Sequence, residues 1–106
     1  EAVRLAGKIF TQLAPLRAMS VAVQEKLTRG ASPIVEAALV KDLGTGVEQM
    51  IPAAIADDLF SRDSEAVPLE LLLTLNYVTQ VAPSFSLRGG TRDILRGMIA
   101  RGLGLR

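Results

Sequence analysis

The sequence predicts an all-α protein, an antiparallel bundle of four helices in one domain that spans residues 1–106. Apolar residues make up 49% of the chain but aromatic residues only 4%. The core must therefore be aliphatic, which suits packed helices. Apolar residues also recur at three- and four-residue intervals in four segments, and proline or glycine separates these segments. Long helical segments with short connections favour an antiparallel bundle.

The first helix is expected from about Val3 to Leu27. Pro15 should kink or split it, because proline cannot donate a backbone hydrogen bond in a helix interior. Arg29 followed by Gly30 is a favourable helix end. The apolar side of this helix consists of Leu5, Ile9, Leu13, Leu16, Val23 and Leu27.

The second helix is expected to begin with Ser32 as N-cap, Pro33 at the first helical position and Glu36 in the first turn. A polar loop is expected to follow it over 61–66. The side of this second helix that lies opposite its buried stripe should carry Lys41, Thr45, Glu48 and Asp58. Its buried stripe should consist of Val40, Leu43, Val47, Met50, Ile51, Ile55 and Leu59.

The third helix is expected from about Pro68 to Val81, and the segment 82–84 should end it. Leucines cover every side of this helix. A helix that is apolar all round is buried on several sides, so in so small a domain it indicates an interface with another domain or subunit.

The fourth helix is expected to begin after Thr91, whose hydroxyl can cap the first turn. Asp93 lies in that turn, where a carboxylate favours the positive end of the helix dipole. Gly89 and Gly90 precede the cap, either as an ordinary tight turn or as a loop that brings the backbone close to a ligand. A small-residue stripe should let another helix approach, and its members are Gly97, Ala100 and Gly104.

The composition excludes several kinds of chemistry. Cysteine and histidine are both absent, so a disulfide, a thiol nucleophile, a Ser-His-Asp triad and an ordinary zinc site are excluded. No signal peptide or membrane span is recognisable, and a cytoplasmic location is expected.

Residues 88–106 carry five arginines against one aspartate, although the whole chain has a net charge of only +1. Arg88, Arg92 and Arg96 are spaced four apart. This stripe could be solvated, form ion pairs with the acidic remainder or bind the phosphates of a nucleotide cofactor. Nucleic-acid binding is not expected, because aromatic residues do not alternate with the arginines.

The last segment as a whole resembles the C-terminal end of flavin-dependent acyl-CoA dehydrogenases. In that family a Gly-Gly-Thr or Glu-Gly-Thr turn precedes a helix that ends in Ala-Arg and Leu-Gly-Leu. The matching residues here are Gly89-Gly90-Thr91, Ile94, Arg96, Ile99-Ala100-Arg101 and Leu103-Gly104-Leu105. The segment 37–45, with Glu48 and Gln49, is also similar to a helix of the family's C-terminal domain.

The resemblance implies an α,β-dehydrogenation of acyl-CoA thioesters, with electrons passed from FAD to an acceptor flavoprotein. It implies substrate contacts at Gly89 and Gly90, and contacts with FAD at Thr91, Arg92 and Asp93. In one branch of the family the catalytic glutamate stands where this chain has Gly89, so no catalytic residue is expected here. The family's N-terminal helical domain and flavin-holding β domain lie outside these 106 residues. We therefore expect the chain alone to be inactive and to belong to a homo- or hetero-oligomeric parent.

One departure from the family pattern affects the flavin site. Near the end of the second helix the family shows a glutamine and a glycine pair that meet the flavin pyrophosphate of a neighbouring subunit. This chain has Asp57, Asp58, Phe60 and Ser61 instead, and carboxylates repel a pyrophosphate. A second interpretation therefore stays open, namely a helical interaction module without a cofactor.

Overall fold

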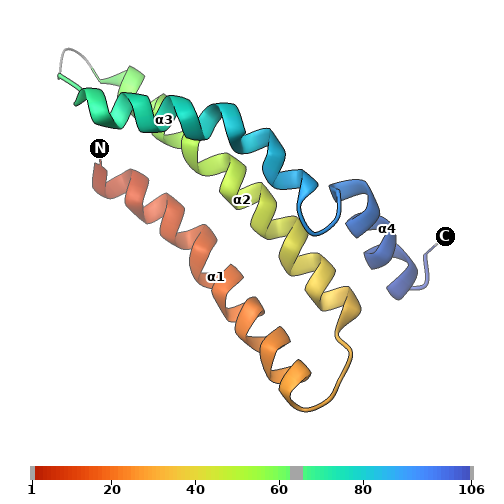
Figure 1. Ribbon diagram of the computed structural model, residues 1–106. Coiled ribbons are helices and arrows are strands. Elements are labelled where there is room, and N and C mark those ends of the chain that lie inside the picture. Colours follow the sequence, from red (N-terminus) through yellow and green to blue (C-terminus); the bar gives the residue numbers. More distant parts are fainter. Residues whose placement is uncertain (1, 63–65, 106) are drawn as a thin grey trace.

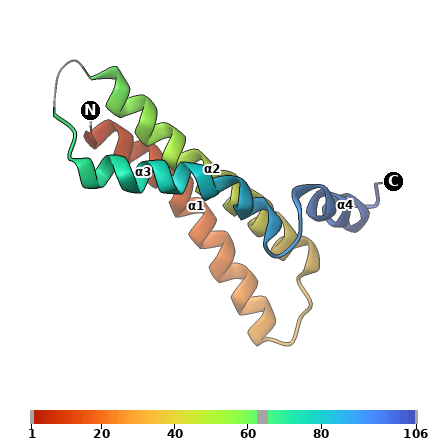
Figure 2. The same cartoon turned by 45° about the horizontal axis from the view of Figure 1, so that its top comes forward.

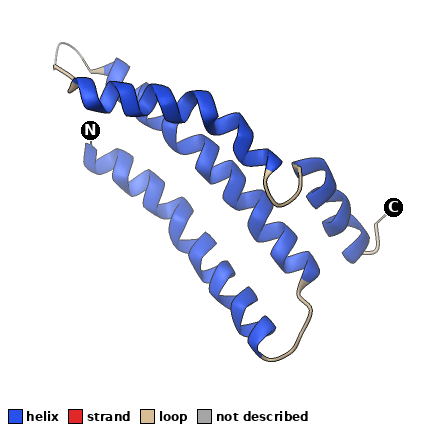
Figure 3. Ribbon diagram, viewed as in Figure 1, coloured by secondary structure: helices blue, strands red, loops and turns tan. Residues whose placement is uncertain are grey.

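The computed structural model describes residues 2–62 and 66–105, and every regular element in this part of the chain is a helix (Figure 3). The prediction of an all-α helix bundle is therefore confirmed. Within the described residues, none of the helices is long and apolar enough to cross a membrane. In chain order the elements are α1 (Ala2–Thr28), α2 (Ile34–Ser61), α3 (Leu69–Val81), the 3₁₀ helix η1 (Ala82–Leu87) and α4 (Arg92–Gly102).

α2 is the central helix of the bundle (Figure 1). α1 runs antiparallel beside it after a short turn, and α1 packs chiefly on α2 (Figure 2). α3, η1 and α4 also pack on α2, and α4 lies against its N-terminal half. Because α2 has neighbours on several sides, polar side chains such as Asp42 and Thr45 are buried on it. A helix with one apolar and one polar side would expose such residues to solvent.

The predicted end of α1 is confirmed by its hydrogen bonds. Gly30 has a φ of 80°, and its N–H donates to the carbonyl of Leu27 at 3.0 Å, while the N–H of Ala31 donates to the carbonyl of Lys26 at 3.0 Å. This pair of bonds is a Schellman motif, which needs a left-handed residue and so favours glycine. α1 is continuous through Pro15, so the expected split of the helix is not found.

The start of α2 differs from the prediction. The N–H of Ile34 donates to the carbonyl of Ser32 at 2.9 Å, and Pro33 has φ −81° and ψ 64°. These angles form an inverse γ-turn. Pro33 therefore lies outside the helix as its N-cap, and the prediction that Ser32 caps α2 is wrong because the helix begins one residue too late for it.

Glu36 lies in the first turn of α2, as predicted. It forms an ion pair with Lys26 near the end of α1. The hydrogen bond from Lys26 lowers the pKa of the Glu36 carboxyl from its ordinary value. This exposed pair therefore links the two ends of the α1–α2 turn.

The core of the chain is small. Of the apolar side chains described, those of Ala38, Ala82 and Leu95 are buried, together with those of Pro33 and Pro52. The predicted stripe of α2 is mostly half-buried, and Leu43 is 44% exposed. Thr45 is the most buried residue, at 1% exposure, so its prediction as part of the opposite, polar side is wrong.

α3 agrees with its predicted range and begins after Pro68. Its sides away from α2 and η1 expose Leu69, Leu73 and Tyr77 at 68%, 59% and 66%. The expected interface on α3 remains a prediction. Of the polar loop predicted over 61–66, residues 63–65 lie outside the described part, and Ser61 is still helical.

Candidate functional site

The turn between η1 and α4 has the backbone conformation that its two glycines indicate. Gly89 has a φ of 69° and Gly90 a φ of 107°, which is a region that other residues rarely adopt. Thr91 follows in an extended conformation, and its Oγ1 accepts the N–H of Ile94 at 3.5 Å. The prediction that Thr91 is the N-cap of α4 is confirmed. Asp93 lies exposed in the first turn.

Both glycines of the turn also lie against other side chains of this chain. A Cβ at Gly89 would lie 3.3 Å from the Cε of Lys41, and one at Gly90 would lie 3.3 Å from the Cδ2 of Leu95. These are tight contacts, so a side chain at either position would be both strained and crowded. Internal packing therefore accounts for part of the glycine requirement, beside any ligand.

α4 is fixed to α2 by one buried apolar side chain and one acidic clamp. Leu95 is 5% exposed. The Nε of Arg92 donates to Asp42 at 2.9 Å, and the Nε of Arg96 lies 3.5 Å from the other oxygen of the same carboxylate. The Asp42 side chain is only 11% exposed, whereas those of Arg92 and Arg96 are 36% and 60% exposed. We call Asp42 with its two arginines the Asp42 clamp.

The third arginine of the predicted stripe also meets α2. Arg88 lies 3.5 Å from the carboxylate of Glu48, and its guanidinium lies over the ring of Phe85, 4.9 Å from the centroid. All three regularly spaced arginines thus reach acidic side chains of α2. This arrangement favours the ion-pair interpretation of the stripe, although each arginine keeps an exposed portion.

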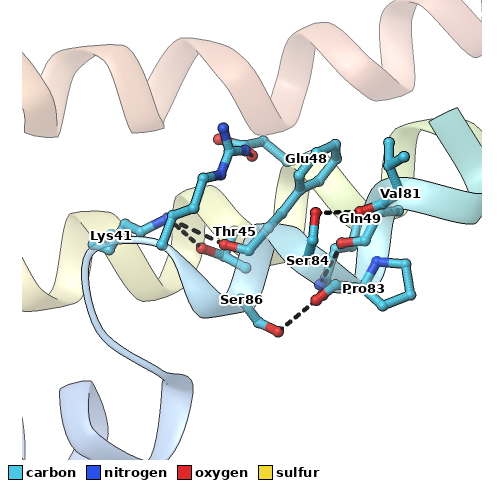
Figure 4. Close-up of polar contacts among 11 residues, drawn as sticks. Lys41, Thr45, Glu48, Gln49, Val81, Pro83, Ser84 and Ser86 are labelled. Carbon is cyan, nitrogen blue, oxygen red and sulfur yellow. Dashed lines mark hydrogen bonds and ion pairs between the residues drawn. The ribbon is translucent and has the colours of Figure 1, made fainter.

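η1 is held by side chains of α2, as Figure 4 shows. The Nζ of Lys41 donates to the hydroxyl of Thr45 at 3.0 Å and lies 3.4 Å from the carbonyl oxygen of Phe85. The amide of Gln49 donates to the carbonyl oxygen of Ala82 at 3.0 Å. These bonds satisfy carbonyls that a 3₁₀ helix leaves poorly paired. They place η1, and with it the glycine turn, at a fixed position on α2.

The polar residues of α2 that hold η1 and α4 were not identified as a group from the sequence. Asp42 bonds to Arg92, 50 positions away, and Gln49 bonds to Ala82, 33 positions away, so no local pattern reveals them. The two glycines on either side of Thr45 do predict a close neighbour, because each costs about 1 kcal/mol relative to alanine in a helix interior and no other feature there favours glycine. Arg92 contacts one of them, with its Nη2 3.6 Å from a Cβ built at Gly46.

The closest helix approach lies at a glycine outside the predicted small-residue stripe. A Cβ at Gly102 would lie 2.0 Å from the Cγ2 of Val35, whereas one at Gly97 meets nothing within 4 Å. Gly104, with a φ of 78°, lies past the end of α4 and closes a Schellman motif. Packing of α4 on α2 therefore depends on Gly102, whereas a Cβ at Gly97 or Gly104 of the predicted stripe would meet nothing within 4 Å.

A groove of about 580 Å³ runs between α1 and α2 beside the start of α4. Its floor is mostly aliphatic, and Lys8 and Arg92 add positive charge. Of the five residues predicted to contact substrate or cofactor, Arg92 lines this groove. The five residues, 89–93, are consecutive in the sequence. Of these, the structure places Arg92 at the groove between α1 and α2.

The acidic residues at the end of α2 remain a departure from the family pattern. Asp57 is exposed, as is Phe60 at 79%. Asp58 forms an ion pair with Arg62 at 2.6 Å. Partial burial raises the pKa of the Asp58 carboxyl, but the hydrogen bond and charge of Arg62 outweigh it, and the pKa lies below its ordinary value. Asp58 is therefore a carboxylate at neutral pH.

Comparison of the chain with protein-family models gives no match, and comparisons with curated proteins and with solved structures give none either. The fold and the site define a helical domain with a glycine turn clamped onto its central helix. Any assignment of function therefore depends on the residues of this turn and of α4.

Proposed function

We propose that this chain is the C-terminal helical domain of an FAD-dependent dehydrogenase that oxidises acyl-CoA thioesters at the α and β carbons. One observation carries the proposal. Residues 89–91, which open the C-terminal segment that carries the family resemblance, form a left-handed glycine pair followed by a threonine-capped helix. This geometry supports a close approach of backbone to a ligand at the positive end of a helix.

The residues of the turn have distinct roles in this proposal. The backbone N–H of Gly89 would polarise the thioester carbonyl, as an oxyanion donor does. Gly90 would lie against the acyl group, and Thr91, Arg92 and Asp93 would border the flavin. When bound, FAD supplies the acceptor for the hydride that leaves the β carbon.

The charges at the turn suit such a role in part. Arg92 is paired with Asp42 but its side chain is 36% exposed, so it can offer N–H donors to an anionic group without leaving the clamp. Gly89 and Asp93 are exposed, which leaves room for a second domain to meet this surface. Position 89 has no carboxylate, so the base that removes the α-proton must come from elsewhere in the larger protein.

We expect the isolated chain to be inactive and the larger protein to be oligomeric. A domain in this role borders a flavin that another domain holds, and it contributes to the subunit interface. The exposed apolar side chains of α1 and α3, with Phe10, Leu69 and Tyr77 each at least 66% exposed, support a domain that is covered by other parts in the assembled protein.

The alternative is a helical interaction module that binds no cofactor. The same exposed apolar surface favours it, and so does the involvement of Arg92 and Arg96 in the Asp42 clamp, because these cations then have a structural role. The two proposals differ in whether a flavin-holding domain belongs to the same protein and whether FAD is bound.

The experiment is to express the complete coding frame that contains these residues and to measure FAD content after gel filtration. The proposal expects stoichiometric FAD and bleaching of the flavin absorbance on anaerobic addition of an acyl-CoA. Asp93→Ala should weaken FAD binding, while Glu70→Gln on α3, far from the turn, should leave it unchanged. A complete frame that binds no FAD would leave the interaction module as the better account.

A further inference from the structure

The chain exposes far more surface than a compact monomer of its size. Its accessible surface is 7758 Å², whereas a folded monomer of 11.3 kDa exposes about 5,700 Å². Its radius of gyration is 17.0 Å, against about 13 Å for a compact domain of this length. The surplus is about 2,000 Å², more than the ~800 Å² that each partner buries in a standard interface.

α1 uses only one of its two apolar sides within the chain. The half-buried residues of α1 are Leu5, Ile9, Leu16, Met19 and Val23. Their spacing is that of one seam of a coiled coil, and this seam faces α2, on which α1 chiefly packs. The remainder of the described part of α1 is exposed.

A second seam runs along the exposed side of α1 with the same alternating four- and three-residue spacing. Val3, Phe10 and Val21 on this seam are 82%, 68% and 43% exposed. Large apolar side chains at such spacing are typical of a helix that pairs with another helix. We call this set the outer seam, and its members are Val3, Gly7, Phe10, Ala14, Arg17, Val21, Gln24 and Thr28.

We propose that the outer seam binds the outer seam of a second copy of this chain, with the two α1 helices antiparallel about a two-fold axis near residues 15–16. In this register Phe10 packs against the partner's Val21, and Ala14 packs against the partner's Arg17. The small alanine gives the arginine stem room to lie along the interface with its head in water. The contact is isologous, as in most homodimers.

Charge complementarity selects the antiparallel orientation. Arg4 and Glu25 lie on the same flank of the outer seam, near opposite ends of α1. An antiparallel pair places each Arg4 opposite the partner's Glu25, which gives two symmetric ion pairs. A parallel pair would instead place Arg17 against the partner's Arg17, and like charges at a seam position oppose pairing.

This dimer does not depend on the flavin proposal, because no residue of the outer seam belongs to the glycine turn. An interface of the standard ~800 Å² per partner would use less than half of the surplus surface, so α3 stays free for other contacts. Loss of FAD binding would leave the dimer proposal intact, and a monomeric chain would leave the flavin proposal intact.

The first test is the mass of the purified chain by light scattering across micromolar concentrations, together with a charge-reversal cycle. A dimer is expected. Arg4→Glu and Glu25→Arg should each weaken dimerisation about tenfold, because two ion pairs become two repulsions. The double variant should recover most of the affinity. Circular dichroism checks that each variant keeps its helices.

The second test fixes the orientation, and it uses the absence of cysteine from the sequence. Gly7→Cys and Gln24→Cys chains are mixed under oxidising conditions, since Gly7 faces the partner's Gln24 in the proposed register and a Cβ at Gly7 meets nothing within 4 Å. Disulfide dimers should form in the mixture but not in either chain alone. Lys8→Cys, one residue off the seam, replaces Gly7→Cys in the control mixture.

Three results would overturn the proposal. A monomeric mass at all concentrations would mean that something other than a second copy covers the outer seam. Cross-linking of each single-cysteine chain with itself would mean that the helices are parallel. Equal cross-linking of the Lys8→Cys control would mean that the two copies meet without a defined register.

Discussion

Removal of the Asp42 carboxylate should release α4 from the bundle more readily than any other single charge change in the described part of the chain. The side chain is 11% exposed and accepts a hydrogen bond from Arg92 at 2.9 Å. A hydrogen bond to a charged group contributes about 1.5–3 kcal/mol. Because Arg92 is partly exposed, solvent screening reduces this to about 1–2 kcal/mol. Arg96, at 3.5 Å and 60% exposed, adds at most about 0.5 kcal/mol.

The expected loss in the free energy of unfolding is therefore about 2 kcal/mol for Asp42→Ala and about 1 kcal/mol for Asp42→Asn, whose amide oxygen can still accept from Arg92. Urea unfolding followed by circular dichroism measures it, at one fixed protein concentration because any dimer adds to the apparent stability. Hydrogen exchange of the α4 amides should show earlier opening of α4 than of α2.

Glu48→Gln is the matched control. Its ion pair with Arg88 is 3.5 Å long and joins side chains that are 49% and 66% exposed, so it should change stability by less than about 0.5 kcal/mol. If Asp42→Ala were no more destabilising than this control, the clamp would not hold α4, and the packing of Leu95 alone would have to account for its position.

Three further predictions concern the helix ends and their packing. Thr91→Ala should cost about 1 kcal/mol by removing the cap of α4, and an unchanged urea midpoint would show that the cap is not formed. Gly102→Ala should cost about 1–3 kcal/mol by overpacking against Val35; adding Val35→Ala should reverse part of the loss, and additive losses would contradict the contact. The lowered pKa of Glu36 means that its pair with Lys26 stabilises the fold above the ordinary value of 4.5, and this contribution is lost as the pH falls through the lower folded pKa. The urea midpoint should thus fall more steeply in acid for the unaltered chain than for Glu36→Gln, and equal slopes would contradict this role.

The parts of the fold that depend on local chemistry could be predicted from the sequence. The end of α1 at Gly30 and the cap of α4 at Thr91 follow from residues within a few positions, and both are confirmed. The positive φ angles at Gly89 and Gly90 likewise follow from the conformational preference of glycine. The prediction that Ser32 caps α2 is wrong because Pro33 takes a γ-turn conformation and is itself the N-cap. The sequence Ser32-Pro33 allows either residue to be the N-cap of the helix.

The parts that depend on distant contacts could not be predicted. Buried Thr45 accepts a hydrogen bond from Lys41, whose Nζ also reaches the carbonyl oxygen of Phe85 in η1, and nothing near Thr45 in the sequence indicates a 3₁₀ helix some forty residues later. Asp42 is recognisable as a clamp only once Arg92 and Arg96 are placed beside it. The close contact at Gly102 could not be predicted because its partner, Val35, lies in the first turn of α2, far from Gly102 in the sequence.

The roles of the site residues 89–93 remain predictions. Their geometry is compatible with a surface that borders a flavin. Packing against Lys41 and Leu95 also explains part of this geometry. The fold of this turn therefore does not by itself determine its function. The helical bundle would persist with either role.

An anaerobic acyl-CoA titration of the protein from the complete coding frame tests the central claim most directly. The account predicts that the protein carries FAD, that the flavin absorbance bleaches as acyl-CoA is added, and that an external electron acceptor restores it. A protein that carries no FAD would contradict the claim and support the interaction module. A protein whose bound flavin is unchanged by acyl-CoA would contradict the proposed substrate.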